Sequence, residues 1–124
     1  MPLSSEAILL ESPWHTRQDS RVSVSVQDAP GGPVVSITGE LDLTSATHLR
    51  ALLMKTVEAC PRGWGITLDL SRVTFCDCTG LHVLLCTRRL ALSNRRPLVI
   101  NAASPRMDRL LEITGTAPLF TSAR

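Results

Sequence analysis

Residues 66–81 read ITLDLSRVTFCDCTGL, and this stretch decides the fold because its hydrophobic period changes partway along. Its first part alternates apolar and polar side chains: Ile66, Thr67, Leu68, Asp69 and Leu70. Such alternation predicts a β-strand with one buried face. Residues 80–93 instead place apolar side chains three and four apart, which predicts a helix. The stretch is therefore expected to form a strand, a loop over residues 71–80 and a helix.

The sequence before this stretch predicts a β-hairpin followed by another helix. Valine alternates with serine over residues 22–26, a second strand is expected over 34–39, and the turn-forming residues 28–33 join the two. The next helix is indicated by one apolar face: Ala46, Leu49, Leu53, Val57 and Cys60. The hydroxyl of Thr44 or Ser45 is expected to cap this helix.

The last part of the chain predicts a short buried strand over residues 98–100 and a third helix that begins at Ser104–Pro105 and ends near Gly115. The element order is ββαβαβα. Because β-α-β connections are right-handed, the last three strands should be parallel. The expected fold is α/β, a small mixed sheet (an N-terminal hairpin plus parallel strands) covered by helices.

Periodicity also divides the chain into segments. Residues 1–19 show no sustained period and are expected to form a flexible N-terminal tail. The folded domain is expected to span residues 20–120, with residues 121–124 as a C-terminal tail.

Composition excludes several classes of function. The 124 residues are 44% hydrophobic but only 3% aromatic, and the net charge is +2 with scattered basic side chains, so no nucleic-acid-binding surface is expected. No apolar run reaches the roughly 18 residues of a membrane span, and the N-terminus does not look like a secretory signal. The chain is therefore expected to be cytoplasmic, with no membrane partner and with reduced thiols at its four cysteines.

Polar residues follow the predicted parallel strands. The carboxyl ends of parallel strands meet at one edge of a sheet, so the loops over residues 39–44, 71–80 and 101–105 should gather there. This edge should bring together side chains that are distant in sequence: Glu40, Asp42, Asp77, Cys78 and Thr79.

The stretch Phe75–Leu81 (FCDCTGL) could hold a metal or a catalytic thiol, but the rest of the sequence disfavours both. Cys76 and Cys78 make half of a zinc site without a second pair, so Cys76 and Cys86 are better interpreted as small core residues. His82 has no evident residue to orient it as a base for a cysteine nucleophile. We expect no metal, no cofactor and no enzymatic activity.

Two further interpretations depend on the helix N-terminus. The helix dipole lowers the pKa of a thiol there, whereas the neighbouring Asp77 raises it, so strong activation of Cys78 is not expected. A phosphate could accept the free amides that follow Thr79, close to acidic groups that repel it, which would suit a partner-release switch. Alternatively, Asp77 or Thr79 serves only as the helix cap.

Three segments in this order resemble the STAS-domain family of bacterial anti-sigma factor antagonists: GELDLTSATHLRALL, ITLDLSRVTFCDCTGLHVLL and SPRMDRLLEITG. The resemblance covers roughly residues 20–120. It implies a protein without catalytic activity that binds an anti-sigma factor, typically a serine kinase of the GHKL ATPase type, and so frees a sigma factor. In this family the kinase phosphorylates the residue after the loop aspartate to eject the antagonist, and a phosphatase resets it.

Carried onto this chain, the resemblance makes Asp77 the loop aspartate and Glu40 and Asp42 the acidic loop beside it. Gly80 and Leu81 open the helix. The partner-binding residues are then expected to be Glu40, Asp42, Asp77, Cys78, Thr79, Gly80 and Leu81.

The chain departs from the family at the phosphoacceptor, which is usually Ser and here is Cys78. Three versions remain open: Thr79 is the acceptor, the protein is an antagonist without a switch, or Cys78 makes the switch a redox one. The version without a switch is favoured because Cys resembles Ser in shape and would keep the binding surface. Two other functions also stay open, an adaptor subunit of a transporter or stress-signalling assembly and a thiol-based sensor.

Overall fold

A four-stranded mixed sheet forms the centre of the protein in the computed structural model, which describes residues 22–121. The strands are β1 (Val22–Ala29), β2 (Gly32–Leu41), β3 (Ile66–Cys76) and β4 (Leu98–Ala103), in the spatial order β1-β2-β3-β4. β1 pairs antiparallel with β2, and the pairs β2/β3 and β3/β4 are parallel. The predicted fold class and strand directions are therefore confirmed.

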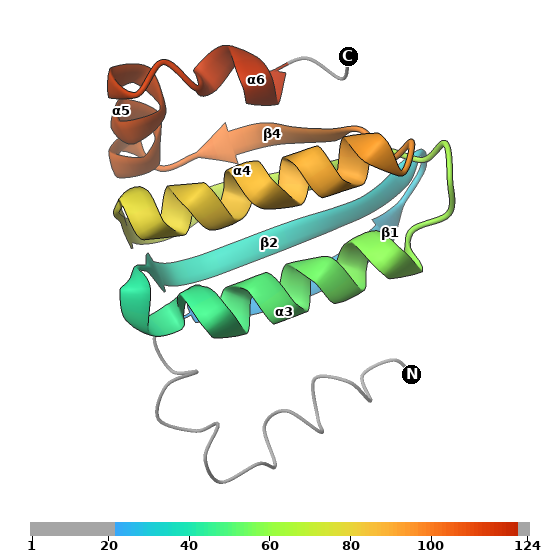
Figure 1. The fold of residues 1–124 in the computed structure, drawn as a ribbon, viewed down its shortest axis with the longest axis horizontal. Helices are drawn as coiled ribbons and strands as arrows, with labels where there is room; N and C mark the ends of the chain where they lie inside the picture. The colour runs from blue at the N-terminus through green and yellow to red at the C-terminus, as the bar shows by residue number, and fades with distance from the viewer. Residues whose placement is uncertain (1–21, 122–124) are drawn as a thin grey trace, which may run out of the picture.

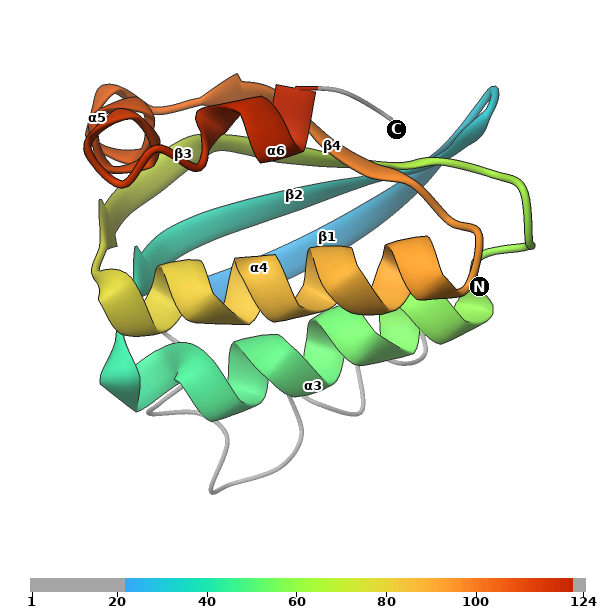
Figure 2. The ribbon, with the colours of Figure 1, turned by 45° about the horizontal axis from the view of Figure 1, so that its top comes forward.

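Helices cover one face of this sheet. α3 (Leu43–Ala59) and α4 (Cys78–Ser93) lie side by side across it, and both begin at the end where β2 and β3 finish (Figures 1 and 2). α5 (Pro105–Ile113) packs against β3, and α6 (Ala117–Thr121) packs beside β4. No helix in the described part of the chain is long and apolar enough to cross a membrane.

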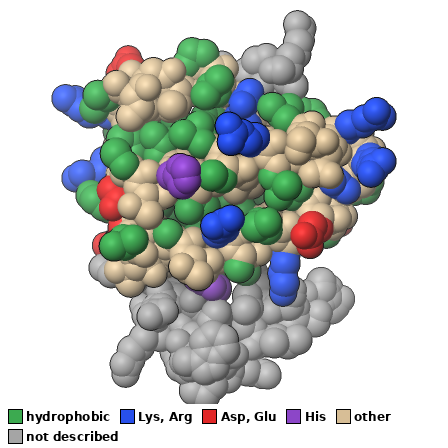
Figure 3. Space-filling model, viewed as in Figure 1, with side chains coloured by type: hydrophobic (Ala, Val, Ile, Leu, Met, Phe, Trp, Pro, Cys, Tyr) green, Lys and Arg blue, Asp and Glu red, His purple; other side chains and the backbone are tan. Residues whose placement is uncertain are grey.

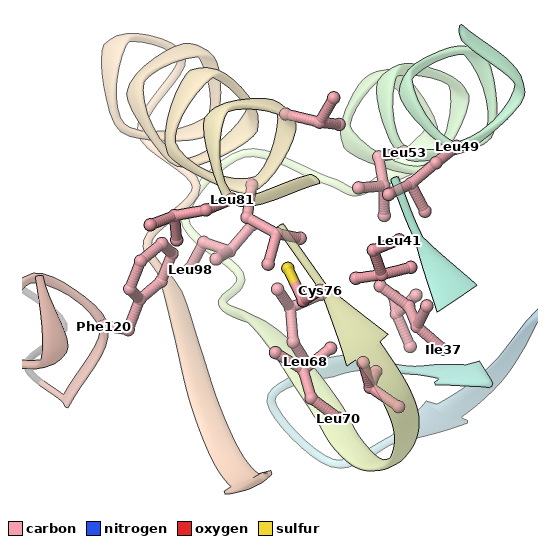
Figure 4. Close-up of a cluster of buried hydrophobic side chains, with 14 of the residues drawn as sticks. Ile37, Leu41, Leu49, Leu53, Leu68, Leu70, Cys76, Leu81, Leu98 and Phe120 are labelled. Carbon is pink, nitrogen blue, oxygen red and sulfur yellow. The ribbon is translucent and has the colours of Figure 1, made fainter. Parts of the chain in front are cut away.

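The core lies between the sheet and α3 and α4. It is built almost entirely from aliphatic side chains, as the low aromatic content requires. The strand positions Ile66, Leu68 and Leu70 are all buried, as are Leu49 and Leu53 of α3. Figure 4 shows Leu68 and Leu70 of β3 in one cluster with Leu49 and Leu53. Their periods were read correctly from the sequence because a buried face repeats every second residue in a strand and every three or four in a helix.

α6 is the element that the sequence did not predict. It has only five residues, too few to show a helical period, yet its Phe120 is 1% exposed and points towards Leu98 (Figure 4). The predicted element order therefore continues by one short helix, which places the largest buried side chain of the described residues against β4.

One predicted boundary was wrong. Residues 71–76 were expected in a loop but continue β3, where Val73 and Cys76 are buried and Phe75 pairs with Glu40 of β2. The interpretation failed because "SRVTFC" breaks the strict alternation that identifies a strand. The predicted tail over residues 1–19 lies outside the described residues.

Candidate functional site: the acidic rim

The ends of β2 and β3 bring two acidic turns together. Leu41 and Cys76 are paired across the parallel strands, so Asp42 and Asp77 follow on neighbouring strands, which are spaced by about 4.8 Å. The backbone N–H of Asp77 donates to the carbonyl of Leu41 over 3.1 Å, which fastens the second turn to the first. The predicted meeting of these two loops is therefore observed.

Each of the two aspartates caps a helix. Asp42 Oδ1 accepts hydrogen bonds from the backbone N–H groups of Thr44 (3.0 Å) and Ser45 (3.1 Å), at the N-terminus of α3. Asp77 Oδ1 accepts from the N–H of Gly80 (3.0 Å), at the N-terminus of α4. The prediction that Thr44 or Ser45 caps the first helix was wrong, because an aspartate that precedes the first turn already reaches those amides.

Ser45 has a different role, which the sequence did not reveal. It is 1% exposed, and its hydroxyl donates to the carbonyl of Glu40 over 2.7 Å. The same hydroxyl accepts from the N–H of Asp42 over 3.1 Å, which completes a capping box. Ser45 thus holds the turn of residues 40–42 against the start of α3.

Gly80 sets how closely α4 approaches this turn. A Cβ atom built on Gly80 would lie 2.7 Å from the Cβ of Leu41 and would also collide with the carbonyl oxygen of Leu41. Only glycine allows the first turn of α4 to rest on the end of β2. Gly80 and Leu81, both predicted to bind a partner, are themselves buried beneath this turn.

The side chains that remain at the surface define what we call the acidic rim: Glu40, Asp42, Leu43, Asp77, Cys78 and Thr79. Acidic and hydrophobic side chains lie next to each other at the end of the molecule where α3 and α4 begin (Figure 3). Leu43 is 76% exposed, the most exposed large hydrophobic side chain among the described residues, and Cys78 is also exposed. The sequence analysis did not identify Leu43. Its position directly after Asp42, a residue type that often caps helices, could have indicated an apolar side chain at the exposed start of a helix.

Thr79 is not the cap of α4. Asp77 holds that position, the Thr79 side chain is half-buried, and within residues 22–121 no hydrogen bond to its hydroxyl is formed. Of the two alternatives for the cap, Asp77 is correct and Thr79 is not, so capping does not use the Thr79 hydroxyl.

The third loop does not reach the acidic rim. Ala103, the last residue of β4, pairs with Leu70, and the N–H of Ser104 donates to the carbonyl of Leu70 over 3.0 Å. β3 continues beyond this point to Cys76, so the backbone of residues 103 and 104 is set back along β3 from Asp77. The Arg106 side chain that follows this loop still reaches the end of β3, where its Cζ lies 5.8 Å from the centroid of the Phe75 ring. The loop backbone is therefore not at the rim as predicted, because β3 is longer than its alternating run.

The cysteines near the rim differ in environment. Burial, then the charges of Asp77 and Cys78, raise the pKa of the Cys76 thiol to about 12, so Cys76 stays protonated at neutral pH. Cys86 was expected in the core but is only half-buried, with Sγ 3.4 Å from His82 Nε2 on the outer side of α4. Among the described residues, no group of three or more His, Cys, Asp or Glu side chains is arranged to hold a metal ion.

The comparison with protein families agrees with this geometry. A family model described as "Mlab, STAS domain" matches residues 24–120. The chain belongs to the STAS-domain family. Among curated relatives, the anti-sigma-B factor antagonist of Bacillus subtilis (strain 168) is 32% identical over 94 residues, which cover 76% of this chain and 84% of the relative.

Other STAS-domain relatives bear the same name or share the fold. The anti-sigma-B factor antagonist of Staphylococcus aureus (strain NCTC 8325 / PS 47) is 33% identical over 69% of this chain and 78% of the relative. The crystal structure of an anti-sigma factor antagonist from Mycobacterium paratuberculosis has 27% identity and a TM-score of 0.69, covering 80% of this chain and 82% of that one. The unphosphorylated anti-sigma factor antagonist SpoIIAA, at 18% identity and a TM-score of 0.65 over 81% of this chain and 86% of its own, shares the fold.

Proposed function

We propose that this STAS domain is an anti-sigma factor antagonist that binds an anti-sigma factor of the GHKL serine-kinase type in the cytoplasm and thereby frees a sigma factor. Relatives that bear this name match 94 and 86 of the 124 residues of this chain. A match of that length must include both acidic turns, because they lie in the middle of the sequence. The observation that carries the proposal is the acidic rim, where two capping aspartates meet at the joined ends of β2 and β3 and an exposed leucine follows the first of them.

The rim has the composition of a docking surface. The exposed Leu43 can fill an apolar pocket of a partner, and burial of such a side chain contributes about 1.5–3 kcal/mol. The carboxylates of Asp42 and Asp77 belong to the same rim and favour a partner that carries Arg or Lys. Both carboxylates are already held in place by capping bonds, so little conformational entropy is lost when they bind.

Thr79 is the residue we propose as phosphoacceptor. Cys78, at the family's usual serine position, offers no hydroxyl, whereas the Thr79 hydroxyl in the same helical turn is not used by the cap. The amides of Gly80 and Leu81, which were expected to be free for a phosphate, are already bonded to Asp77. A phosphate on Thr79 would instead act through its charge: it would add negative charge beside Asp77 and so alter the surface that the partner binds. Attachment of the phosphate would therefore change the rim without unfolding α4.

Binding is tested by co-purification with the anti-sigma kinase, using variants that separate charge from capping. Asp77→Asn keeps a good N-cap and removes the charge, whereas Asp77→Ala removes both. We expect Asp77→Asn and Leu43→Lys each to weaken the complex by at least ten-fold while the circular dichroism spectrum stays unchanged. A complex that retains its affinity in both variants would show that the rim is not the interface.

Phosphorylation is tested by incubating the complex with ATP and measuring intact mass. The wild-type chain should gain about 80 Da, the mass of one phosphate. Thr79→Val should gain nothing, and Cys78→Ala should still gain it. A stable complex without any gain of mass would identify an antagonist without a switch, whereas association with a membrane ATPase in place of the kinase would favour the adaptor role.

A further inference from the structure

β1 is an edge strand that lacks the features by which proteins usually protect such edges. It has eight residues, pairs regularly with β2 without a bulge, and contains no proline and no lysine. Its single charged residue, Asp28, lies near its end. The other edge strand, β4, is packed by α6. Within residues 22–121, the outer backbone groups of β1 therefore have no partner strand.

A groove runs beside this edge, between β1 and the flank of α3. Its volume is about 1050 Å³, and its lining is mostly apolar, with Val24, Val26, Leu52, Lys55, Ala59 and Trp64 among the contributing residues. Val26 is 49% exposed and Trp64 is 46% exposed. A strand that extended the sheet past β1 would cover both the open backbone edge and these side chains.

We propose that the occupant is a second copy of this chain, paired through β1 with β1 of the partner in antiparallel orientation about a two-fold axis at Val24. The sequence of Val22–Val26 is VSVSV, which reads the same in both directions. Pairing about Val24 therefore places valine opposite valine on the helix-covered face and Ser23 opposite Ser25 on the open face. A two-fold interface requires such a self-complementary surface.

The charge of Asp28 disfavours registers centred nearer the end of β1. An axis at Ser25 would place Asp28 directly opposite the buried Val22, and an axis at Val26 would place it opposite Val24. With the axis at Val24, the two Asp28 carboxylates lie eight strand positions apart, about 27 Å at 3.4 Å per residue. Neither carboxylate is then buried against a valine, and the two do not repel each other.

α3 would form part of the interface between the two copies. It packs against both β1 and β2, and in Figure 1 it lies in front of β1. The flank of α3 that lines the groove, including Leu52 and Ala59, would face the partner's α3.

Sedimentation of the full chain over a range of concentrations gives the first test. We expect a reversible dimer. Ser25 is exposed on the open face, and in the proposed register the two Ser25 side chains are diagonal neighbours about 7–8 Å apart. Ser25→Lys and Ser25→Glu should each raise the dissociation constant at least ten-fold, and an equimolar mixture of the two should recover dimers. A monomer at all concentrations, including one whose edge is covered by its own N-terminal segment, would refute the proposal.

Disulfide crosslinking tests the register, in a Cys78→Ser background that removes the exposed thiol. In this register the two copies of Val24 lie opposite each other, with Cα atoms about 4.5–5.5 Å apart, which is within the range for a disulfide. The two copies of Val26 are four strand positions apart, so their Cα atoms would be separated by about 14 Å. Val24→Cys should therefore form a covalent dimer under mild oxidation, and the matched control Val26→Cys should not. Crosslinking of Val26→Cys alone would place the axis elsewhere and contradict the register.

Discussion

Because Gly80 lies against Leu41, we expect replacement of Gly80 by alanine to change the stability of the domain in the direction opposite to that usual for glycines inside helices. Replacing glycine by alanine inside a helix usually stabilises a protein by about 0.5–1 kcal/mol, because alanine has less backbone freedom to lose. At Gly80 the added Cβ would lie 2.7 Å from Leu41 Cβ, where carbon atoms normally stay about 3.5–4.0 Å apart. Gly80→Ala should therefore destabilise the domain.

The magnitude follows from the rigidity of the atoms involved. The colliding atoms are the Cβ and carbonyl oxygen of Leu41, which cannot rotate away, so α4 must move by about 1 Å. Overpacking of this kind costs about 1–3 kcal/mol, and the helical preference of alanine returns up to about 1 kcal/mol. We expect a net loss of about 1–1.5 kcal/mol in the free energy of unfolding.

Urea unfolding followed by circular dichroism measures this loss. Cys78→Ala, an exposed substitution in the same helical turn, serves as the control and should stay within about 0.5 kcal/mol of the wild type. Because Gly80 also sets the distance between the two acidic turns, Gly80→Ala should weaken partner binding beyond its effect on folding. A Gly80→Ala variant as stable as the wild type would show that α4 does not rest on the end of β2 as described.

Four other outcomes can be measured. Asp42→Ala should cost about 1 kcal/mol in urea unfolding, and Asp42→Asn much less, because asparagine keeps the cap. Phe120→Ala should cost about 3–5 kcal/mol, since it empties a fully buried site; a small loss would mean that α6 is not docked. The folded pKa of Cys76, about 12, lies above its ordinary value of 9.0, so this thiol stabilises the fold below pH 9 and loses that contribution towards pH 12. The urea midpoint should fall less between pH 8 and pH 10.5 in Cys76→Ala than in wild type. Iodoacetamide at pH 8 should label Cys78 first, as peptide mass mapping would show, and earlier labelling of Cys76 would contradict its burial.

Much of the candidate site could be predicted because its position depends on strand direction alone. Once β2 and β3 are parallel neighbours, the residues after them must share an edge, and Asp42 and Asp77 do. The roles of single side chains could not be predicted in the same way. Asp42, Thr44 and Ser45 are all good capping residues by type. Only the backbone path of the turn decides that Asp42 accepts hydrogen bonds from the helix amides while the Ser45 hydroxyl donates to the carbonyl of Glu40.

The sequence by itself determined the secondary structure with a clear period and the order of the elements. A buried face must repeat with the pitch of its own strand or helix, which is local information. Only the tertiary structure decided the length of β3, the docking of α6 and the exposure of Leu43. Each of these depends on contacts between segments distant in the chain: β3 is extended by pairing with β2, Phe120 is buried against β4, and Leu43 is left outside because Ser45 turns inward in the first turn of α3. No local pattern encodes such contacts, because they arise when the elements pack together.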